Sequence, residues 1–206
     1  SYVRLKLYPI IHRMAKARCA SKMQPGSDLK PLYVGGEWVQ TPDVHRIYNK
    51  YTGELFVQVS KAGTKEKDMA IEAAQRAMRQ SEFGPAQRFQ VLHRAHEVLL
   101  ERLEEFAACI AQEGGKPIAD ARTEVNRSAL VFLLSAQEAA KIAGEIVPTQ
   151  VAPNVNIGPR LIYTIKKPIG IVCAISPFNF PLNLVVHKVA PALAAGNPVI
   201  IKPASD

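Results

Sequence analysis

Cysteine is scarce in this sequence of 206 residues, which contains only Cys19, Cys109 and Cys173. Three cysteines form neither an even set nor a Cys-x-x-Cys pair, and this argues against a secreted disulfide scaffold and a zinc site. The sequence also lacks any apolar run of the roughly 18 residues that a membrane-spanning helix needs. It contains no Gly-x-Gly-x-x-Gly or Gly-x-x-x-x-Gly-Lys motif, so the common phosphate-binding loops are absent. With 48% hydrophobic residues, the composition predicts a soluble globular protein with no membrane association.

Acidic residues are almost missing from the first 30 positions. Residues 1–30 contain seven lysines and arginines but a single acid, Asp28, so this basic tail carries +6 of the formal net charge of +8. The rest of the chain is nearly balanced and does not interleave aromatic with basic residues, so we predict no nucleic-acid partner. Three interpretations of the tail stay open: an organellar transit peptide, a start assigned too early with Met14 or Met23 as the true one, and a solvated arm.

Residues 31–144 begin with two hairpin patterns and continue with three helical ones. Short β-type runs flank Gly35-Gly36 and Tyr51-Thr52-Gly53, and each set predicts a hairpin. The first helix is expected after Thr64 as its N-cap, the second from about residue 85 to residue 113, and the third from about residue 117 to residue 144. Gly114 and Gly115 are expected to end the second helix.

The remaining residues predict a ribbon and one βαβ unit. Residues 145–167 contain three prolines and an alternating apolar pattern, which indicates an exposed two-stranded ribbon that reaches a partner. Residues 168–175 and 198–201 are continuous apolar runs, typical of parallel strands buried on both faces, and a helical pattern lies between them. A single βαβ unit leaves its sheet edges uncovered, so we expect the chain to be the front part of something longer.

Ligands of open α/β sheets bind at the carboxyl ends of the strands, so the candidate site comprises residues 176–180 and 202–205. Asn179 lies between two bulky rings and two prolines, where a rigidly held amide could donate to a developing oxyanion. Asn179 could equally cap the following helix. Lys202 leaves an apolar strand at its tip, where a cofactor's ribose or phosphate would lie, and the alternative is an ordinary surface lysine.

Other chemically reactive side chains are interpreted as structural. His93 and His96 are three positions apart in the second helix but have no visible third ligand, so we interpret them as surface residues and predict no metal site. Cys173 lies inside an apolar strand without a basic neighbour that would lower its pKa. We therefore predict a small core residue and not a nucleophile.

Three motifs resemble signatures of the NAD(P)-dependent aldehyde dehydrogenases. They are Ser-Pro-Phe-Asn-Phe-Pro-Leu at residues 176–182, His-Lys-Val-Ala-Pro-Ala-Leu-Ala-Ala-Gly-Asn at residues 187–197 and Lys-Pro-Ala-Ser at residues 202–205. Agreement at residues 33–38, 52–54 and 113–117 extends the resemblance to residues 31–206, and the tail lies outside it. The resemblance implies an α/β fold: the start of a doubly wound Rossmann-type domain, with N-terminal β-hairpins and helices and a protruding β-ribbon.

The same resemblance implies four segments. They are the tail at 1–30, the N-terminal part of a cofactor-binding domain at 31–144, an oligomerisation ribbon at 145–167, and the truncated first βαβ unit of the core at 168–206. It also implies oxidation of an aldehyde to a carboxylic acid, through a cysteine thiohemiacetal and thioester, with NAD or NADP as cofactor. The family's glutamate base and catalytic cysteine would lie beyond Asp206, so the chain alone is not expected to turn over.

Roles for individual residues follow from the resemblance by position. Asn179 matches the donor to the oxyanion and is the implied catalytic residue. Cofactor binding is implied for Ile175, Ser176, Pro177, Phe178, Lys202 and Ser205. Substrate binding is implied for Phe180, Asn183, Leu184 and His187.

Some finer expectations depend on single residues. Ser205 stands where many NAD-preferring members have an acid, which favours NADP or dual use. Asn183 and His187 are polar, which favours a small hydroxylated or anionic aldehyde. We expect the full-length protein to be a homodimer or homotetramer. We expect it in the cytoplasm, or in the mitochondrial matrix if the tail is a transit peptide. The alternative function is a non-catalytic interaction module that works through the ribbon.

Overall fold

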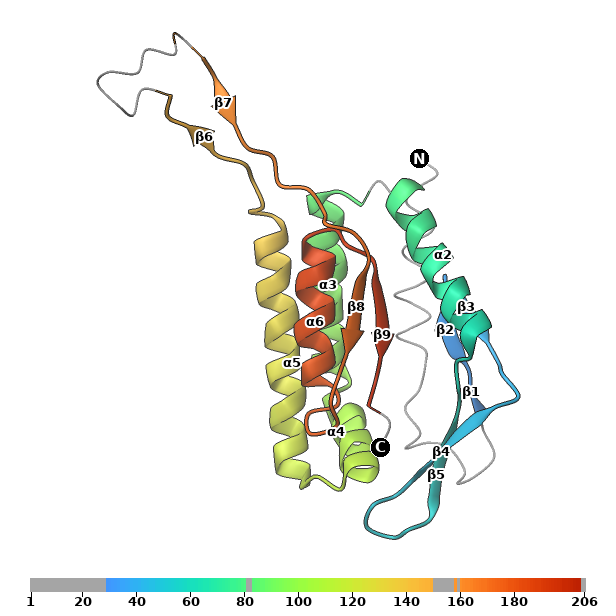
Figure 1. Ribbon diagram of the computed structural model, residues 1–206. Coiled ribbons are helices and arrows are strands. Elements are labelled where there is room, and N and C mark those ends of the chain that lie inside the picture. The colour runs from blue at the N-terminus through green and yellow to red at the C-terminus, as the bar shows by residue number, and fades with distance from the viewer. Residues whose placement is uncertain (1–28, 81–82, 150–157, 159, 205–206) are drawn as a thin grey trace.

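Two small sheets make up the N-terminal part of the chain. The computed structural model describes residues 29–80, 83–149, 158 and 160–204, and Figure 1 shows their arrangement. Strands β2 (Leu32–Val34) and β3 (Glu37–Val39) form one predicted hairpin, and β4 (Val44–Tyr48) and β5 (Leu55–Ser60) form the other. Strand β1 (Leu29–Lys30) pairs in parallel with β5, so the strand order in that sheet is β1-β5-β4.

Two predicted boundaries near the N-terminus need correction. Leu29 and Lys30 belong to a strand and not to the tail, because they add to the free edge of β5. The rest of the tail and its transit-peptide interpretation lie outside the described residues. Thr64, predicted as an N-cap, is already the first residue of helix α2 (Thr64–Gln80), and the amide of the preceding Gly63 donates to Glu66 Oε2 at 2.8 Å.

The second predicted helix is divided in the structure into α3 (Pro85–Glu101) and α4 (Leu103–Gly114). Arg102 separates them with φ −113° and ψ 23°, and its guanidinium donates to Glu105 at 2.8 and 2.6 Å. The apolar pattern does not reveal this break, because residues of both helices pack against the same helix, α5 (Ile118–Ala139). Gly115, with φ 65°, ends α4 as predicted.

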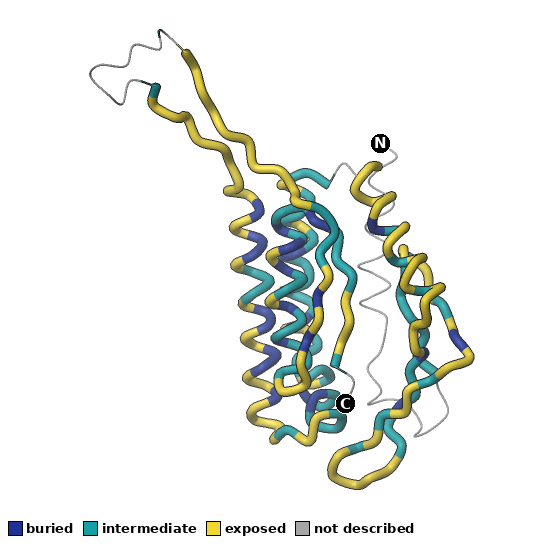
Figure 2. The backbone as a smooth tube through the Cα atoms, viewed as in Figure 1, coloured by how far each residue is buried: buried dark blue, intermediate teal, exposed yellow. Residues whose placement is uncertain are grey.

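Helices α3, α5 and α6 (Asn183–Ala194) lie side by side and form the core of the molecule (Figure 1). Leu92 of α3 is fully buried in one cluster with residues of α5 and α6. The buried face of α5 consists mostly of small residues, which let neighbouring helices approach closely, and Figure 2 shows buried positions recurring along this helix. Within the described residues, no helix combines the length and the apolar character needed to cross a membrane.

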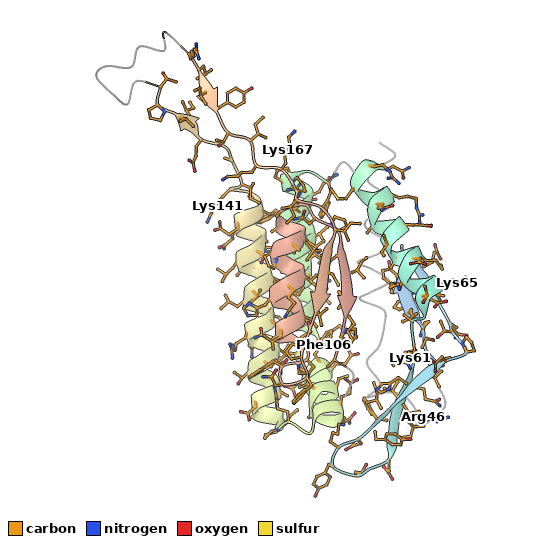
Figure 3. The ribbon with its side chains drawn as sticks, viewed as in Figure 1. Arg46, Lys61, Lys65, Phe106, Lys141 and Lys167 are labelled. Atoms are coloured by element: carbon orange, nitrogen blue, oxygen red, sulfur yellow. The ribbon has the colours of Figure 1, made fainter. Side chains whose placement is uncertain are left out.

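The predicted ribbon is present and projects from the helices (Figure 1). Strands β6 (Ile146–Val147) and β7 (Ile162–Tyr163) pair antiparallel, and both are exposed (Figure 2). At its base the Glu145 amide donates to Thr164 Oγ1 and the Thr164 amide to the Glu145 carbonyl, both at 2.9 Å. A Cβ at Gly144 would collide with the Thr164 carbonyl oxygen. Lys141 and Lys167 mark this end of the ribbon in Figure 3.

The predicted βαβ unit consists of β8 (Val172–Ile175), α6 and β9 (Val199–Lys202), and its two strands are parallel. Its burial differs from the prediction, because β8 is covered on one face only. Ala174 is buried, whereas Cys173 and Ile175 on the opposite face are exposed. The predictions of a strand buried on both faces and of a core cysteine are therefore wrong. An apolar pattern indicates that a strand face is suited to burial, but among the described residues nothing covers the face of Cys173 and Ile175.

The turn between α6 and β9 fixes the start of both strands. Gly196 has φ 84°, and the guanidinium of Arg88 occupies the place that a Cβ of residue 196 would take. Arg88 donates through Nε to the Phe83 carbonyl at 2.7 Å and through Nη1 to the Ala194 carbonyl at 3.4 Å. Asn197 is buried, and its Oδ1 accepts a hydrogen bond from the Gly170 amide at 3.0 Å.

Candidate functional site

The carboxyl ends of β8 and β9 bring the two predicted site segments together. Ile175 lies opposite Lys202 in the register of the sheet, and the Ser176 amide donates to the Lys202 carbonyl at 3.1 Å. Lys202 is the last residue of β9, and its side chain is exposed, with Nζ donating to the Pro203 carbonyl at 2.9 Å. The loop after β8 and the lysine that ends β9 therefore share one edge of the sheet.

This edge combines exposed apolar side chains with a buried hydroxyl. Ile175 and Phe178 are 63% and 65% exposed, large values for apolar residues. Ser176 is buried between them in sequence, and its Oγ has no hydrogen-bond partner among the described residues. A buried polar atom without a partner is costly, and the exposed side chains of Ile175 and Phe178 leave an apolar surface on which a ligand could rest.

The structure excludes the capping interpretation of Asn179. Helix α6 begins at Asn183, its N-cap is Leu182, and no side chain caps it. Asn179 therefore does not cap the helix, and its side chain is exposed in the loop between β8 and α6. Its backbone carbonyl accepts a hydrogen bond from Lys116 Nζ at 2.9 Å.

Glu124 lies behind this loop and is a residue that the sequence predictions missed. Its side chain is fully buried on α5. One carboxylate oxygen accepts Lys116 Nζ at 2.5 Å, and the other accepts the amides of Leu182 and Asn183 at 2.9 and 3.0 Å. Glu124 follows Ala121 by three positions and shares its helix face, which indicates its burial but does not identify the partners of its carboxylate.

Two cations flank the ring of Phe180. Lys116 Nζ lies 3.9 Å from the ring centroid, and the Arg127 guanidinium carbon lies 5.8 Å from it. Both distances are within the range at which a cation is attracted to an aromatic face. The charge of Lys116 is balanced by its ion pair with the buried Glu124, whereas Arg127 is exposed and presents its positive charge to solvent.

The predicted substrate residues fall into different environments. Asn183 is only 2% exposed and packs against α5, where its Oδ1 accepts a hydrogen bond from Ser128 Oγ at 3.4 Å. Phe180 and Leu184 are half-buried, and His187 is exposed one turn further along α6. Phe180 therefore lies beside Asn179, whereas the Asn183 side chain is buried between α6 and α5. Ser205 lies outside the described residues.

The histidine pair needs a correction. His96 is half-buried, and its Nδ1 lies 2.9 Å from the Ala129 carbonyl of α5, so it links two helices. His93 lies 3.5 Å from Glu97. Neither is a plain surface residue. The described part of the chain holds no cluster of residues suited to a metal ion.

Known proteins are similar to this chain in sequence and in fold. Residues 38–206 match the model of the aldehyde dehydrogenase family. The chain is 45% identical over 173 residues to 3-sulfolactaldehyde dehydrogenase of Priestia aryabhattai, and this match covers 84% of the chain but only 36% of the relative.

Two solved structures are also similar. Aldehyde dehydrogenase 21 from Physcomitrella patens, in complex with the reaction product succinate, has a TM-score of 0.81 and 38% identity, covering 89% of this chain and 38% of that one. NADP-dependent glyceraldehyde-3-phosphate dehydrogenase from Bacillus halodurans C-125, complexed with NADP, has a TM-score of 0.78 and 30% identity, covering 87% and 38%. The interaction-module alternative gains no support from these comparisons. The match over most of the sequence, together with the shared α/β fold, shows that this chain belongs to the aldehyde dehydrogenase family.

Proposed function

We propose that this chain is the amino-terminal part of an NAD(P)-dependent aldehyde dehydrogenase. The balanced reaction converts an aldehyde, water and NAD(P)+ to a carboxylate, NAD(P)H and two protons. The observation that carries the proposal is the meeting of the Asn179 loop and Lys202 at one sheet edge, in a chain whose family is known. The catalytic cysteine and the glutamate base would come from residues outside this chain.

Cofactor binding is assigned to the carboxyl edge of β8 and β9. Ile175, Ser176, Pro177 and Phe178 would form a wall against the cofactor, and Lys202 and Ser205 would bind its adenosine ribose. The exposed apolar side chains of Ile175 and Phe178 support this assignment, as does the complex of one structural neighbour with NADP. When bound, NAD(P) supplies the acceptor for the hydride that leaves the substrate.

Asn179 is proposed to donate its side-chain amide to the oxyanion that develops on the aldehyde oxygen. Its exposure in a loop with a fixed backbone supports this role, because a donor held in place needs no reorganisation during the reaction. Removing one such donor lowers kcat by about 10²- to 10³-fold in enzymes that use them. The same loss is expected for Asn179→Ala.

We infer that the substrate is a small hydroxylated or anionic aldehyde. Asn183 no longer supports this inference, because its side chain is buried against α5. The support comes from the exposed Arg127 beside Phe180, from the exposed His187, and from the names of a relative that acts on 3-sulfolactaldehyde and a neighbour that binds succinate.

Steady-state kinetics of the full-length protein would test these proposals. We expect a larger kcat/KM for glycolaldehyde or lactaldehyde than for hexanal, and measurable use of NADP beside NAD. A clear preference for hexanal would refute the substrate class, and a strong preference for NAD would refute the cofactor inference from Ser205. No aldehyde oxidation with either cofactor would refute the function itself.

Assembly through the ribbon is a further part of the proposal. Ile146, Leu161 and Tyr163 are 75%, 73% and 62% exposed, and such apolar surface is typical of an interaction site. The mass of the full-length protein in solution distinguishes a homodimer or homotetramer from a monomer.

A further inference from the structure

We infer that Lys116 and Glu124 are positioning residues that hold Asn179 in place for the reaction. The inference rests on the proposed function, because it assigns these residues a role through Asn179. Neither residue is proposed to touch the substrate. Together they connect the loop after β8 to the interior of the helix bundle.

Glu124 fixes the far end of the loop. Its carboxylate, fully buried on α5, accepts the amides of Leu182 and Asn183 at 2.9 and 3.0 Å, where the loop ends and α6 begins. The near end is fixed separately, because the Ser176 amide donates to Lys202 on β9 at 3.1 Å. Asn179 lies between these two ends and needs a restraint of its own.

Lys116 supplies that restraint. Its Nζ donates to Glu124 at 2.5 Å and to the carbonyl of Asn179 at 2.9 Å, and it lies 3.9 Å from the centroid of the Phe180 ring. One ammonium group therefore holds the backbone of residue 179 and the side chain of residue 180. Its own position is set by the buried carboxylate, since the side chain of Lys116 is only 17% exposed.

The nature of this contact favours positioning over stability as its role. A buried ion pair gains little over well-packed apolar residues, because removing both charges from water offsets their attraction. A charged bridge does, however, define one geometry for the groups it joins. The bridge here joins α5, the start of α6 and the carbonyl of Asn179.

A double-mutant cycle in the full-length enzyme tests the inference. Lys116→Met keeps the length of the side chain and removes the ammonium. We expect it to lower kcat/KM for the aldehyde by about 10- to 100-fold, with the KM for the cofactor unchanged. In the Asn179→Ala background the same change should lower kcat/KM by less than about threefold, because residues that act as a unit are not additive. Equal losses in the two backgrounds would overturn the inference.

The matched control is Lys141→Met. Lys141 forms an exposed ion pair with Glu138 at 2.9 Å, far from the loop, and its loss should leave kcat/KM unchanged. If Lys116→Met fails to fold, Lys116→Arg keeps the cation but not the point donor that reaches both Glu124 and Asn179. A loss of activity in Lys116→Arg that vanishes in the Asn179→Ala background supports positioning, and one that persists there contradicts it.

Amide hydrogen exchange gives a readout that does not depend on activity. In Lys116→Met or Lys116→Arg, the amides of residues 177–184 should exchange faster, while those around Leu92 in α3 keep their protection. Unchanged exchange in the loop would overturn the inference even if the enzyme is active. If the parent protein shows no aldehyde oxidation, the proposed function fails, and faster exchange in the loop would still support the restraint itself.

Discussion

Replacing Gly196 with alanine tests how the turn before β9 is held. Two effects add. A residue other than glycine at φ 84° costs about 1–2 kcal/mol. The new Cβ would also collide with the Arg88 guanidinium, which must move and give up its bond to the Phe83 carbonyl at 2.7 Å. That charged hydrogen bond is worth about 1.5 kcal/mol at the low end of its range, because water reaches Arg88. We expect a total loss of about 3 kcal/mol.

Urea unfolding followed by circular dichroism measures this loss. With a slope of about 2–3 kcal/mol per molar urea, the midpoint should fall by about 1–1.5 M. The control is Gly36→Ala, since Gly36 has φ 94° and nothing within 4 Å of its missing Cβ, so only the backbone effect of about 1–2 kcal/mol remains.

The Arg88→Ala background separates the two effects. Without the guanidinium, Gly196→Ala should cost only the backbone amount, so the two changes couple by about 1.5 kcal/mol. Equal losses with and without Arg88 would refute the reasoning, because the collision would then contribute nothing.

Three further predictions concern the helices. Leu92→Ala should lower the free energy of unfolding by about 2–5 kcal/mol, seen in the same urea titration, because Leu92 is fully buried among α3, α5 and α6, and a loss below 1 kcal/mol would contradict that packing. Burial raises the pKa of Glu113 above its ordinary 4.5, so its contribution to stability is full below pH 4.5 and is lost as the pH rises through the raised pKa. The free energy of unfolding of Glu113→Gln, relative to that of the parent, should therefore be higher at pH 7 than at pH 4. Thermal unfolding at both pH values checks the sign. The hydrogen bonds from Arg122 lower the pKa of Glu104. This ion pair therefore contributes to stability above pH 4.5, and its contribution is lost as the pH falls through the lowered pKa. Arg122→Ala should reduce stability slightly at pH 7 and not at pH 2.

Local patterns predicted most of the secondary structure because the forces that form it are local. Gly35 and Gly53 adopt positive φ values in the two predicted hairpin turns, where glycine has no steric penalty. The parallel pairing of β8 with β9 also followed from the sequence, since two apolar runs separated by one helix favour a βαβ unit. The break at Arg102 did not follow, because α3 and α4 present one continuous apolar stripe to α5.

Long-range contacts explain what the sequence could not reveal at the site. The meeting of Ile175 and Lys202 was predictable from strand direction alone. By contrast, Glu124 is buried because it meets Lys116 and the amides of residues 182 and 183, and no local pattern identifies such partners. The exposure of Cys173 escaped prediction for a related reason: an apolar strand shows what it can bury but not what covers it.

The narrow base of the ribbon makes the ribbon an exchangeable part of the molecule. Strands β6 and β7 pair with each other, and two hydrogen bonds between Glu145 and Thr164 close the loop where it leaves the body. Ribbons of other lengths or sequences can therefore be grafted between these two residues without altering the path of the chain toward Asn179. Gly144 sets the limit of this freedom, since any side chain there would force the base apart. If the ribbon carries a partner surface, as proposed above, a change of partner requires no change at the sheet edge formed by Ile175 and Lys202.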